Sequence, residues 1–143
     1  MTTPTFATIN IGTSANDGTG DTLRAAAQKI NDNFAACVHR YTQIVDVTAN
    51  YTIQSSDAGK LLRVNSAGTV TITLPDSFDA GFGVPVLRRG AGAVQFATTG
   101  GASMNNEFSH TQIARQHGWA QVFVEANATG TAAAWNMSGS TAP

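Results

Sequence analysis

Charge and cysteine are both scarce in this chain. Of its 143 residues, 12% are Asp, Glu, Lys or Arg, about half of the roughly 25% that is usual in soluble domains. The formal net charge is -1, so the basic excess with which proteins neutralise nucleic-acid phosphates is missing. Cys37 is the single cysteine, which excludes an intrachain disulfide and a thiolate metal cluster. We therefore expect neither a nucleic-acid partner nor a disulfide-stapled fold.

Long apolar segments are missing as well. The first residues, Met1–Phe6, have no positive region followed by an apolar run, which a signal peptide would need. No apolar stretch approaches the roughly 20 residues that span a bilayer. The sequence therefore predicts a protein made in a cytoplasm, with no membrane partner.

The sequence is instead rich in small polar residues and falls into three zones. Residues Met1–Gly20 are polar and end in Asn, Asp and Gly, which favour turns, so they predict an extended arm and a compact loop. A helix is expected from about Thr22 to Arg40, with Asp21 as its N-cap. The remainder reads as strands and turns. We predict an N-terminal attachment and oligomerisation segment over residues 1–42 and a β-rich domain over 43–143.

The apolar positions of the expected helix form a narrow seam. They are spaced four, three, four, three and four residues apart, as in a heptad pattern: Leu23, Ala27, Ile30, Phe34, Cys37 and Tyr41. One hypothesis is that this seam packs on the chain's own β-domain. The other is that the helix associates with copies of itself, which would place Leu23, Ile30 and Phe34 on a symmetry axis.

The third zone alternates apolar and polar residues over short stretches. In the clearest one, Val70, Ile72 and Leu74 share one face and Pro75 ends the strand. Strands are expected at Gln43–Val47, Tyr51–Ile53, Leu61–Val64, Thr69–Leu74, Gly83–Arg88, Ala93–Ala97, Ile113–Arg115, Trp119–Glu125 and Thr131–Met137. The turns at Gly90–Gly92 and Asn127–Gly130 have hairpin chemistry. The fold class is therefore mainly β, with one α-helix followed by a small antiparallel β-sandwich or barrel-like domain.

Residue patterns that carry catalysis or bind metals are not found. The Asn16–Asp21 run has oxygen ligands like part of a calcium loop, but the further ligands and the distal Glu are missing, so a turn is favoured. His39, His110 and His117 lack zinc or iron spacing. There is no nucleophile elbow, Walker loop or dinucleotide fingerprint. We expect a protein that is not an enzyme and holds no cofactor or metal.

Two aromatic residues near the C-terminus, Trp119 and Phe123, share one face of an expected strand. Trp119 and Phe123 alternate with Ala120, Val122 and Val124, so one set faces the core and the other faces outward. Burial in the core or in a subunit interface is favoured over sugar stacking, because large aromatic side chains are usually buried.

Two segments near the N-terminus resemble a recurrent phage sequence. Ile11–Arg24 contains NDGTGD-x-LR, and Ala27–Phe34 contains KINxNF. This pattern resembles the opening of many phage tail-fibre, baseplate and other virion structural proteins. The segments Asp57–Leu62 and Val70–Pro75 also look like small β-modules of tail-associated phage proteins. The resemblance implies a virion protein, commonly trimeric, whose N-terminus joins it to the particle.

The residues predicted to attach or oligomerise the chain come from these segments. Arg24 is poorly placed for the helix dipole, so we expect it to pair with Asp17, with Asp21 or with a carboxylate of a neighbouring chain. Asn31 and Asn33 can bond exposed backbone of another segment. The full set is Asn16, Asp17, Gly18, Gly20, Asp21, Leu23, Arg24, Ala27, Ile30, Asn31, Asn33 and Phe34.

The leading functional hypothesis is a homotrimeric short tail-fibre, baseplate or fibre-adaptor subunit that docks on other phage structural proteins by its N-terminus. It would be made in the cytoplasm of the host bacterium and reside in the virion. A capsid decoration or head-fibre protein is an alternative. A second alternative is a module that recognises host glycans through exposed aromatics such as Trp119. An enzyme such as a depolymerase has no recognisable site.

Overall fold

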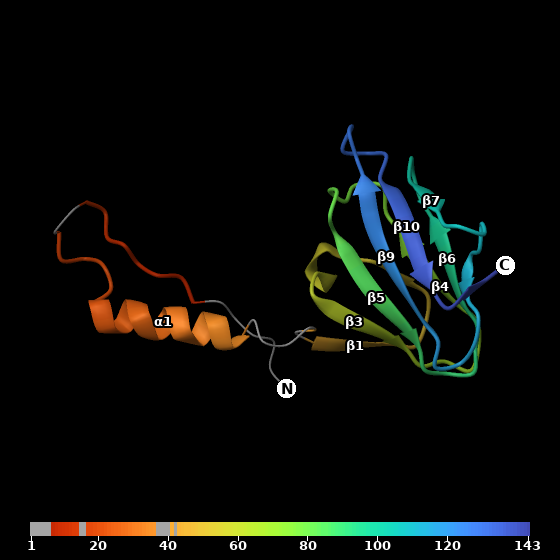
Figure 1. Ribbon diagram of the computed structural model, residues 1–143, viewed down its shortest axis with the longest axis horizontal. Coiled ribbons are helices and arrows are strands. Elements are labelled where there is room, and N and C mark those ends of the chain that lie inside the picture. The colour runs from red at the N-terminus through yellow and green to blue at the C-terminus, as the bar shows by residue number, and fades with distance from the viewer. Residues whose placement is uncertain (1–6, 15–16, 37–40, 42) are drawn as a thin grey trace. The chain divides into compact units, whose positions relative to one another are not determined.

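The computed structural model describes residues 7–14, 17–36, 41 and 43–143. The chain divides into two compact units, Met1–Gln43 and Ile44–Pro143, which are described separately. Figure 1 shows the helix of the first unit and the strands of the second. In the described part of the chain, no helix is both long and apolar enough to cross a membrane.

The first unit is built on the helix α1, which runs over Leu23–Ala36. The expected helix is confirmed over these residues, whereas positions 37–40 of the prediction, including Cys37, lie outside the described residues. Tyr41 lies outside α1, so it is not part of the helical seam. The segment that precedes the helix folds back along it (Figure 1).

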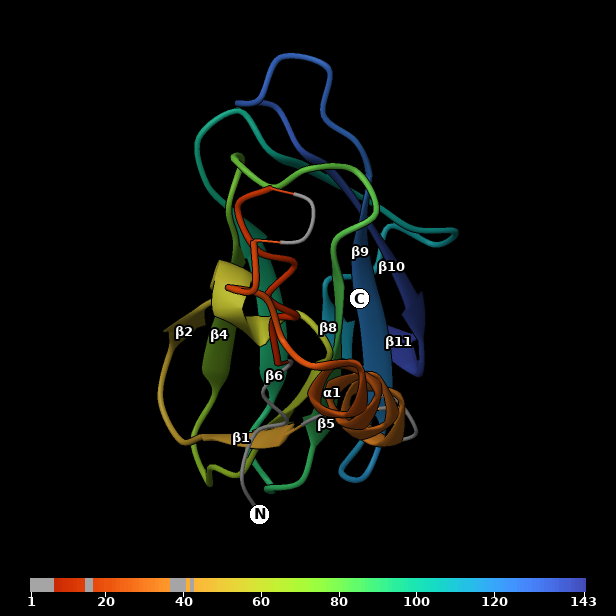
Figure 2. The same ribbon diagram turned by 90° about the vertical axis from the view of Figure 1, so that its left-hand side faces the viewer.

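The second unit is a sandwich of two β-sheets, which Figure 2 shows from a second direction. The larger sheet has six strands in the order β1-β3-β5-β9-β10-β7, and the smaller has five in the order β11-β8-β6-β4-β2. A short 3-10 helix, η1, covers Ser55–Asp57. The strands are β1 Gln43–Val47, β2 Tyr51–Thr52, β3 Lys60–Val64, β4 Val70–Leu74, β5 Gly83–Arg88, β6 Val94–Thr98, β7 Ser103–Asn105, β8 Gln112–Ile113, β9 Trp119–Ala126, β10 Ala134–Gly139 and β11 Thr141–Ala142.

The mainly β sandwich is confirmed, but the expected antiparallel arrangement holds for only part of each sheet. β3 pairs parallel with β5, and β4 pairs parallel with β6. From β3 to β6 the chain alternates between the two sheets, so each strand returns to its sheet with the direction of the strand two before it. The result is that both sheets mix parallel and antiparallel neighbours.

The same alternation changes the role of one predicted turn. Gly90–Gly92 joins β5 to β6, which lie in different sheets, so it is an arch between sheets and not a hairpin. This arch lies directly on the Ser66–Gly68 turn, and a Cβ at Gly90 would overlap the Ser66 carbonyl. Glycine is needed there because of this close backbone approach. The Asn127–Gly130 turn does join antiparallel neighbours, β9 and β10.

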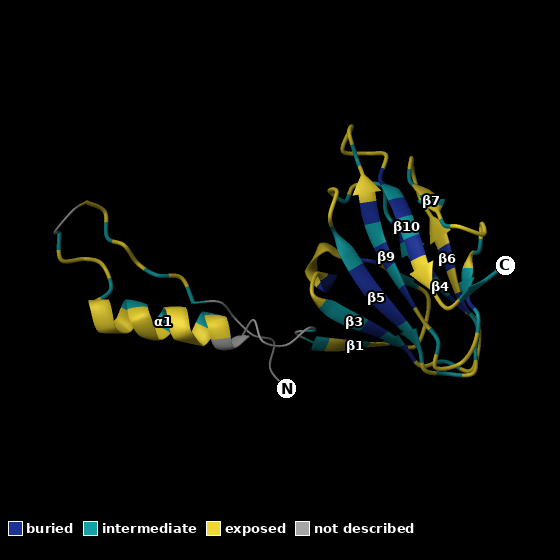
Figure 3. Ribbon diagram, viewed as in Figure 1, coloured by how far each residue is buried: buried dark blue, intermediate teal, exposed yellow. Residues whose placement is uncertain are grey.

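The core lies between the two sheets, and buried residues concentrate in these strands (Figure 3). The inward face predicted for β4 is confirmed, since Val70, Ile72 and Leu74 are all buried. Ala120, Val122 and Val124 of β9 are buried as well, whereas Trp119 on the other face is 50% exposed. The hydrophobic alternation of the sequence therefore defines the inner face of each of these strands.

Trp135 of β10 is the largest fully buried side chain. Its indole Nε1 donates a 2.7 Å hydrogen bond to the carbonyl oxygen of Pro75. The ring stands edge-on to Phe78 and Phe82, with centroid separations of 5.7 and 6.0 Å. A buried indole adds a large apolar area to the core, and its satisfied N–H fixes the orientation of the ring. Trp135 therefore joins the end of β4 to the 78–82 segment.

A buried carboxylate connects β2 to the 3-10 helix η1. Asp57 is 1% exposed, and its Oδ2 accepts hydrogen bonds from the Tyr51 hydroxyl at 3.0 Å and from the backbone N–H of Gln54 at 2.8 Å. Burial of the phenol, together with the neighbouring Asp57 carboxylate, raises the pKa of Tyr51 to about 12. The pair fixes β2 against η1.

We predict that Trp135→Phe lowers the free energy of unfolding by about 1–3 kcal/mol, because the partly buried Pro75 carbonyl loses its donor. The matched change Trp119→Phe, at a half-exposed site, should cost about 0.5 kcal/mol or less. Urea unfolding of the two variants measures both values. Equal losses would contradict this assignment of the core.

Tyr51 also predicts a loss of stability in strong alkali. The unfolded chain loses the phenol proton near the ordinary pKa of 10.0, and the folded chain only near 12, so stability from this group declines as pH rises between these values. In a spectrophotometric titration, the difference between wild type and Tyr51→Phe should show ionisation near pH 12. Asp57→Asn should move that ionisation to lower pH. An unchanged titration in Asp57→Asn would refute the role of the carboxylate.

Candidate functional site

The start of α1 differs from the prediction. Thr22, and not Asp21, is the N-cap: its Oγ1 accepts the backbone N–H of Ala25 at 3.2 Å. Asp21 instead holds the arm, because its Oδ2 accepts from the backbone N–H of Asn10 at 2.8 Å and from Lys29 Nζ at 2.7 Å. The hydrogen bond from Lys29 holds the pKa of Asp21 below its ordinary value. Asp21 therefore connects the helix to the arm before it.

The arm is fastened at two further points along the helix. Lys29 Nζ also donates to the Thr8 carbonyl at 2.9 Å. One turn later, the Asn33 side chain forms two hydrogen bonds with the backbone of Ala7. Its Oδ1 accepts the Ala7 N–H at 2.8 Å, and its Nδ2 donates to the Ala7 carbonyl at 3.1 Å. The expectation that Asn33 bonds the backbone of another segment is confirmed. Asn31 is exposed on the helix surface.

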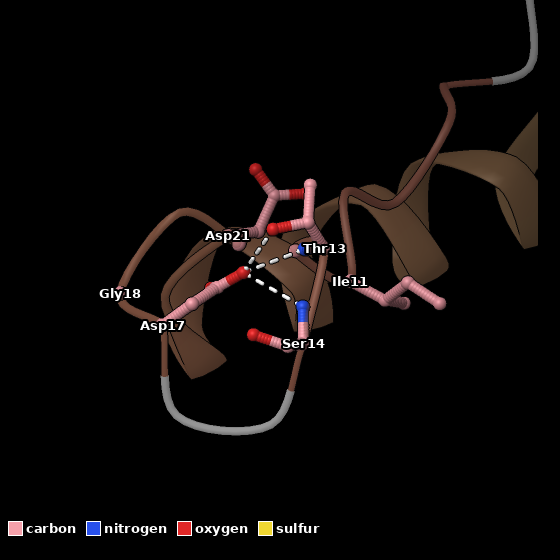
Figure 4. Close-up of a pocket in the computed structure, with 8 residues that line it drawn as sticks. Ile11, Thr13, Ser14, Asp17, Gly18 and Asp21 are labelled. Carbon is pink, nitrogen blue, oxygen red and sulfur yellow. Dashed lines mark hydrogen bonds between the residues drawn. The ribbon is translucent and has the colours of Figure 1, made fainter.

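Asp17 is the centre of the loop between arm and helix (Figure 4). Its Oδ2 accepts from the Thr13 N–H at 2.7 Å, the Thr13 hydroxyl at 2.6 Å and the Ser14 N–H at 2.8 Å. Its Oδ1 accepts from the Thr19 N–H at 2.9 Å. These donors, the Thr13 hydroxyl first among them, hold the pKa of Asp17 well below its ordinary range. The carboxylate thus replaces the backbone carbonyls that would close an ordinary turn.

The glycines of this loop meet two different requirements. Gly18 has a φ of 72°, a backbone conformation that L-residues with a side chain rarely adopt. Gly20 is needed for space, since a Cβ there would lie 3.0 Å from the Asn10 carbonyl oxygen. Gly12 combines both, with a φ of 78° and a Cβ position 2.7 Å from Asp17 Oδ1. The expectation that side chains would obstruct this loop is confirmed, and Gly12 is an addition to it.

An open hollow of about 440 Å³ lies over this loop, and Figure 4 shows the residues around it. It is lined by Ile11, Gly12, Thr13, Ser14, Asp17, Gly18, Gly20 and Asp21. The N–H and O–H groups that point at Asp17 would repel a cation, so the carboxylate closes a turn instead of coordinating calcium. Among the described residues, no three His, Cys, Asp or Glu side chains come together as metal ligands. Asn16 lies outside the described residues.

The apolar seam lies on the side of α1 that the arm does not hold. Ala26, Lys29 and Asn33 are half-buried on the arm side. Along the seam, the exposed fractions are 88% for Leu23, 41% for Ile30 and 71% for Phe34, and Ala27 is exposed as well. Figure 3 shows this exposure along the helix. In the described part of the first unit, the heptad positions are therefore left open to solvent.

Arg24 has no ion-pair partner among the described residues. The prediction of a partner at Asp17 or Asp21 is wrong, because loop donors bind the first and Lys29 binds the second. Arg24 is exposed near the start of the seam. A carboxylate of a neighbouring chain stays as the predicted partner.

Both histidines of the second unit, His110 and His117, lie in loops between strands. His110 Nδ1 lies 3.0 Å from Thr141 Oγ1, which ties a loop to β11. His117 is exposed in the turn before β9, with a φ of 65°. His39 lies outside the described residues.

Comparison with known protein families assigns the class of the chain. Residues 7–137 match the family model described as bacteriophage T4 gp9/10-like protein, N-terminal. The protein is thus a bacteriophage structural protein of the tail and fibre type, a component of the virion. Because the match spans most of the chain, the chain belongs to the bacteriophage T4 gp9/10-like N-terminal family. No curated protein matches the chain.

Sequence reasoning missed several residues that build this site. Lys29 is the most important, because it contacts both Asp21 and the Thr8 carbonyl. Asp21 and Lys29 lie eight residues apart, across two turns of helix, which was the available signal. Thr13 gave no signal, since its contact with Asp17 depends on the folded loop.

We predict that Asp17→Ala releases the loop. The backbone N–H groups of Thr13, Ser14 and Thr19 lose their acceptor, so their hydrogen exchange should become much faster. The control Asp32→Ala, on the exposed helix surface, should leave these three amides protected. Amide exchange followed by NMR measures both variants. Full protection in Asp17→Ala would refute the central role of this carboxylate.

Proposed function

We propose that the chain is a homotrimeric structural subunit of the phage tail, as a short fibre, baseplate or fibre-adaptor protein, with no catalytic role. The observation that carries the proposal is the exposed seam of Leu23, Ile30 and Phe34 at heptad spacing. Family membership supports the phage tail setting. The seam supports the self-association.

Burial of the seam in an interface would explain why its exposed positions are apolar. Full burial of a Leu, Ile or Phe side chain contributes about 1.5–3 kcal/mol relative to exposure. A helix of 14 residues is marginal by itself in water, so it gains most from packing. Association of three helices along this seam would bury these side chains in each chain and stabilise α1.

Arg24 fits the same arrangement. It is exposed beside Leu23 and has no carboxylate partner among the described residues of its own chain. In a bundle of copies, residues that flank a seam face the neighbouring helix and set partner and orientation through charge pairs. We infer that Arg24 pairs with a carboxylate of the adjacent chain.

The loop and its hollow are proposed as the docking element. Asp17 gives the loop a defined shape, and Ile11 stands 89% exposed at the edge of the hollow. A fixed polar loop that carries an exposed apolar side chain suits a contact with another phage structural protein. The N-terminal segment would then both gather three chains and dock them.

A capsid decoration or head-fibre protein is the alternative within the virion, and the number of copies per particle separates it from a tail protein. Hundreds of copies would indicate the capsid, and tens or fewer would indicate the tail.

Recognition of host glycans through Trp119 is a further alternative, since this side chain is half-exposed. Its test is loss of host-cell binding in Trp119→Ala with the fold retained.

Light scattering after size exclusion tests the trimer directly. We predict a mass near three times 14.8 kDa for the wild-type chain. Ile30→Asp places a charge in the seam and should give monomers, because three buried carboxylates would repel one another. The matched control Asn31→Asp adds the same side chain one position away, on the exposed surface, and should stay trimeric.

A wild-type chain that is monomeric in solution would contradict the proposal. It would favour the other hypothesis for the seam, in which the helix packs on its own β-domain. Equal effects of Ile30→Asp and Asn31→Asp would show that charge on the helix, and not the seam, controls association.

A further inference from the structure

The loop between β7 and β8 is held rigid by one side chain. Asn106 Oδ1 accepts the backbone N–H groups of Phe108 at 3.1 Å and His110 at 2.7 Å, and its Nδ2 donates to the His110 carbonyl at 2.6 Å. Ser109 has a φ of 55°, which is uncommon for a residue with a side chain. His110 is tied in turn to Thr141. The polar groups of the loop are thus used to fix its shape.

This fixed loop holds an apolar ring in solvent. Phe108 is 65% exposed, and its ring centroid lies 5.3 Å from that of His110 at an interplanar angle of 33°. The ring is therefore supported on one side and open on the other. Strained backbone and an exposed aromatic together indicate a contact site, because neither stabilises the fold.

A hollow of about 270 Å³ lies beside this ring. Asn136 and Ser138 line it from β10, where they alternate with the buried Trp135 and Met137 and so face away from the core. Glu107 adds an exposed carboxylate. The walls thus combine an aromatic face with an amide, a hydroxyl and a carboxylate, and the lining contains no Lys or Arg.

We propose that the Phe108 hollow binds a neutral sugar ring. The apolar C–H face of a sugar stacks on an exposed aromatic ring, and its hydroxyls donate to carboxylate and amide oxygens. The carboxylate of Glu107 disfavours phosphate and acidic sugars, since no cation of the lining offsets it. The volume of about 270 Å³ lies just below the roughly 300–1,000 Å³ of pockets for drug-sized ligands, which suits one sugar unit.

This site is separate from the proposed trimer and from docking by the N-terminus. All of its lining residues lie in the second unit, Ile44–Pro143. It also differs from the glycan hypothesis based on Trp119, which does not line this hollow. Loss of the trimer would therefore leave the sugar proposal standing, and the reverse also holds.

Saturation-transfer NMR on the full chain tests the proposal. The probes are the methyl glycosides of glucose, galactose, mannose, rhamnose and N-acetylglucosamine, with glucuronate as the acidic counterpart. We expect at least one neutral sugar to bind in the millimolar range and glucuronate to bind more weakly. Dextran and mannan, tested in parallel, show whether the bound unit is a free sugar or part of a polymer.

The variants locate the binding. Phe108→Ala should weaken it by about tenfold, through loss of the stacking surface. Glu107→Gln should weaken it less, because an amide oxygen still accepts one hydroxyl. Trp119→Ala removes another exposed aromatic of the same unit and should leave binding unchanged. All three sites are exposed, so an unaltered amide spectrum can confirm the fold.

Two results would overturn the proposal. The first is the absence of binding for every neutral sugar, which would assign Phe108 to a contact with protein instead. The second is binding that survives Phe108→Ala, or that falls equally in Trp119→Ala.

Discussion

The contacts of Lys29 and Asn33 with the arm decide which side of α1 is free. Lys29 bonds Asp21 and the Thr8 carbonyl, and Asn33 bonds both backbone groups of Ala7. These contacts occupy the polar side of the helix, so the seam of Leu23, Ile30 and Phe34 is left exposed. The ion pair is partly exposed and weak by itself, whereas the set of hydrogen bonds around it gives the arm one position. The same contacts place the loop, its hollow and the docking surface proposed for them.

The second unit rests on a different constraint, the passage of the chain between two sheets. Because β3 to β6 alternate between the sheets, every turn among them is an arch, and two arches touch at Gly90 and Ser66. The inner faces of these strands form one core. Trp135 lies in this core and donates a hydrogen bond to the Pro75 carbonyl at the end of β4. Surface loops such as the one around Asn106 can then carry special geometry without loss of the fold.

The strands were predictable where local pattern is strong. β5 begins and ends at the expected residues, and β4 differs from its prediction by one residue, since Val, Ile and Leu alternate with Thr there. β7 and β11 were missed because they are two or three residues long and mostly polar or small. The parallel pairing of β3 with β5 and of β4 with β6 was not predicted, because the sequence of a single strand does not show which strand it will pair with. The turn chemistry of Gly90–Gly92 is also the same in a hairpin and in an arch.

The site was predictable in outline, and its contacts were not. The turn-forming residues around Asp17 indicated the loop, and the heptad spacing indicated an apolar seam on α1. The choice between Asp21 and Thr22 as N-cap could not be made locally, because both have the required oxygen and only the tertiary contact with Lys29 distinguishes them. The Phe108 hollow was equally hidden, since Asn106 acts through the folded loop.

The central claim is that the exposed seam of α1 is an interface between copies of the chain. A crystal structure of the assembled protein tests it most directly, through the surroundings of Phe34. The account predicts three Phe34 rings packed about a threefold axis, with Leu23 and Ile30 in contact along it. A Phe34 ring packed on the β-domain of its own chain, or left in solvent in a monomer, would contradict it.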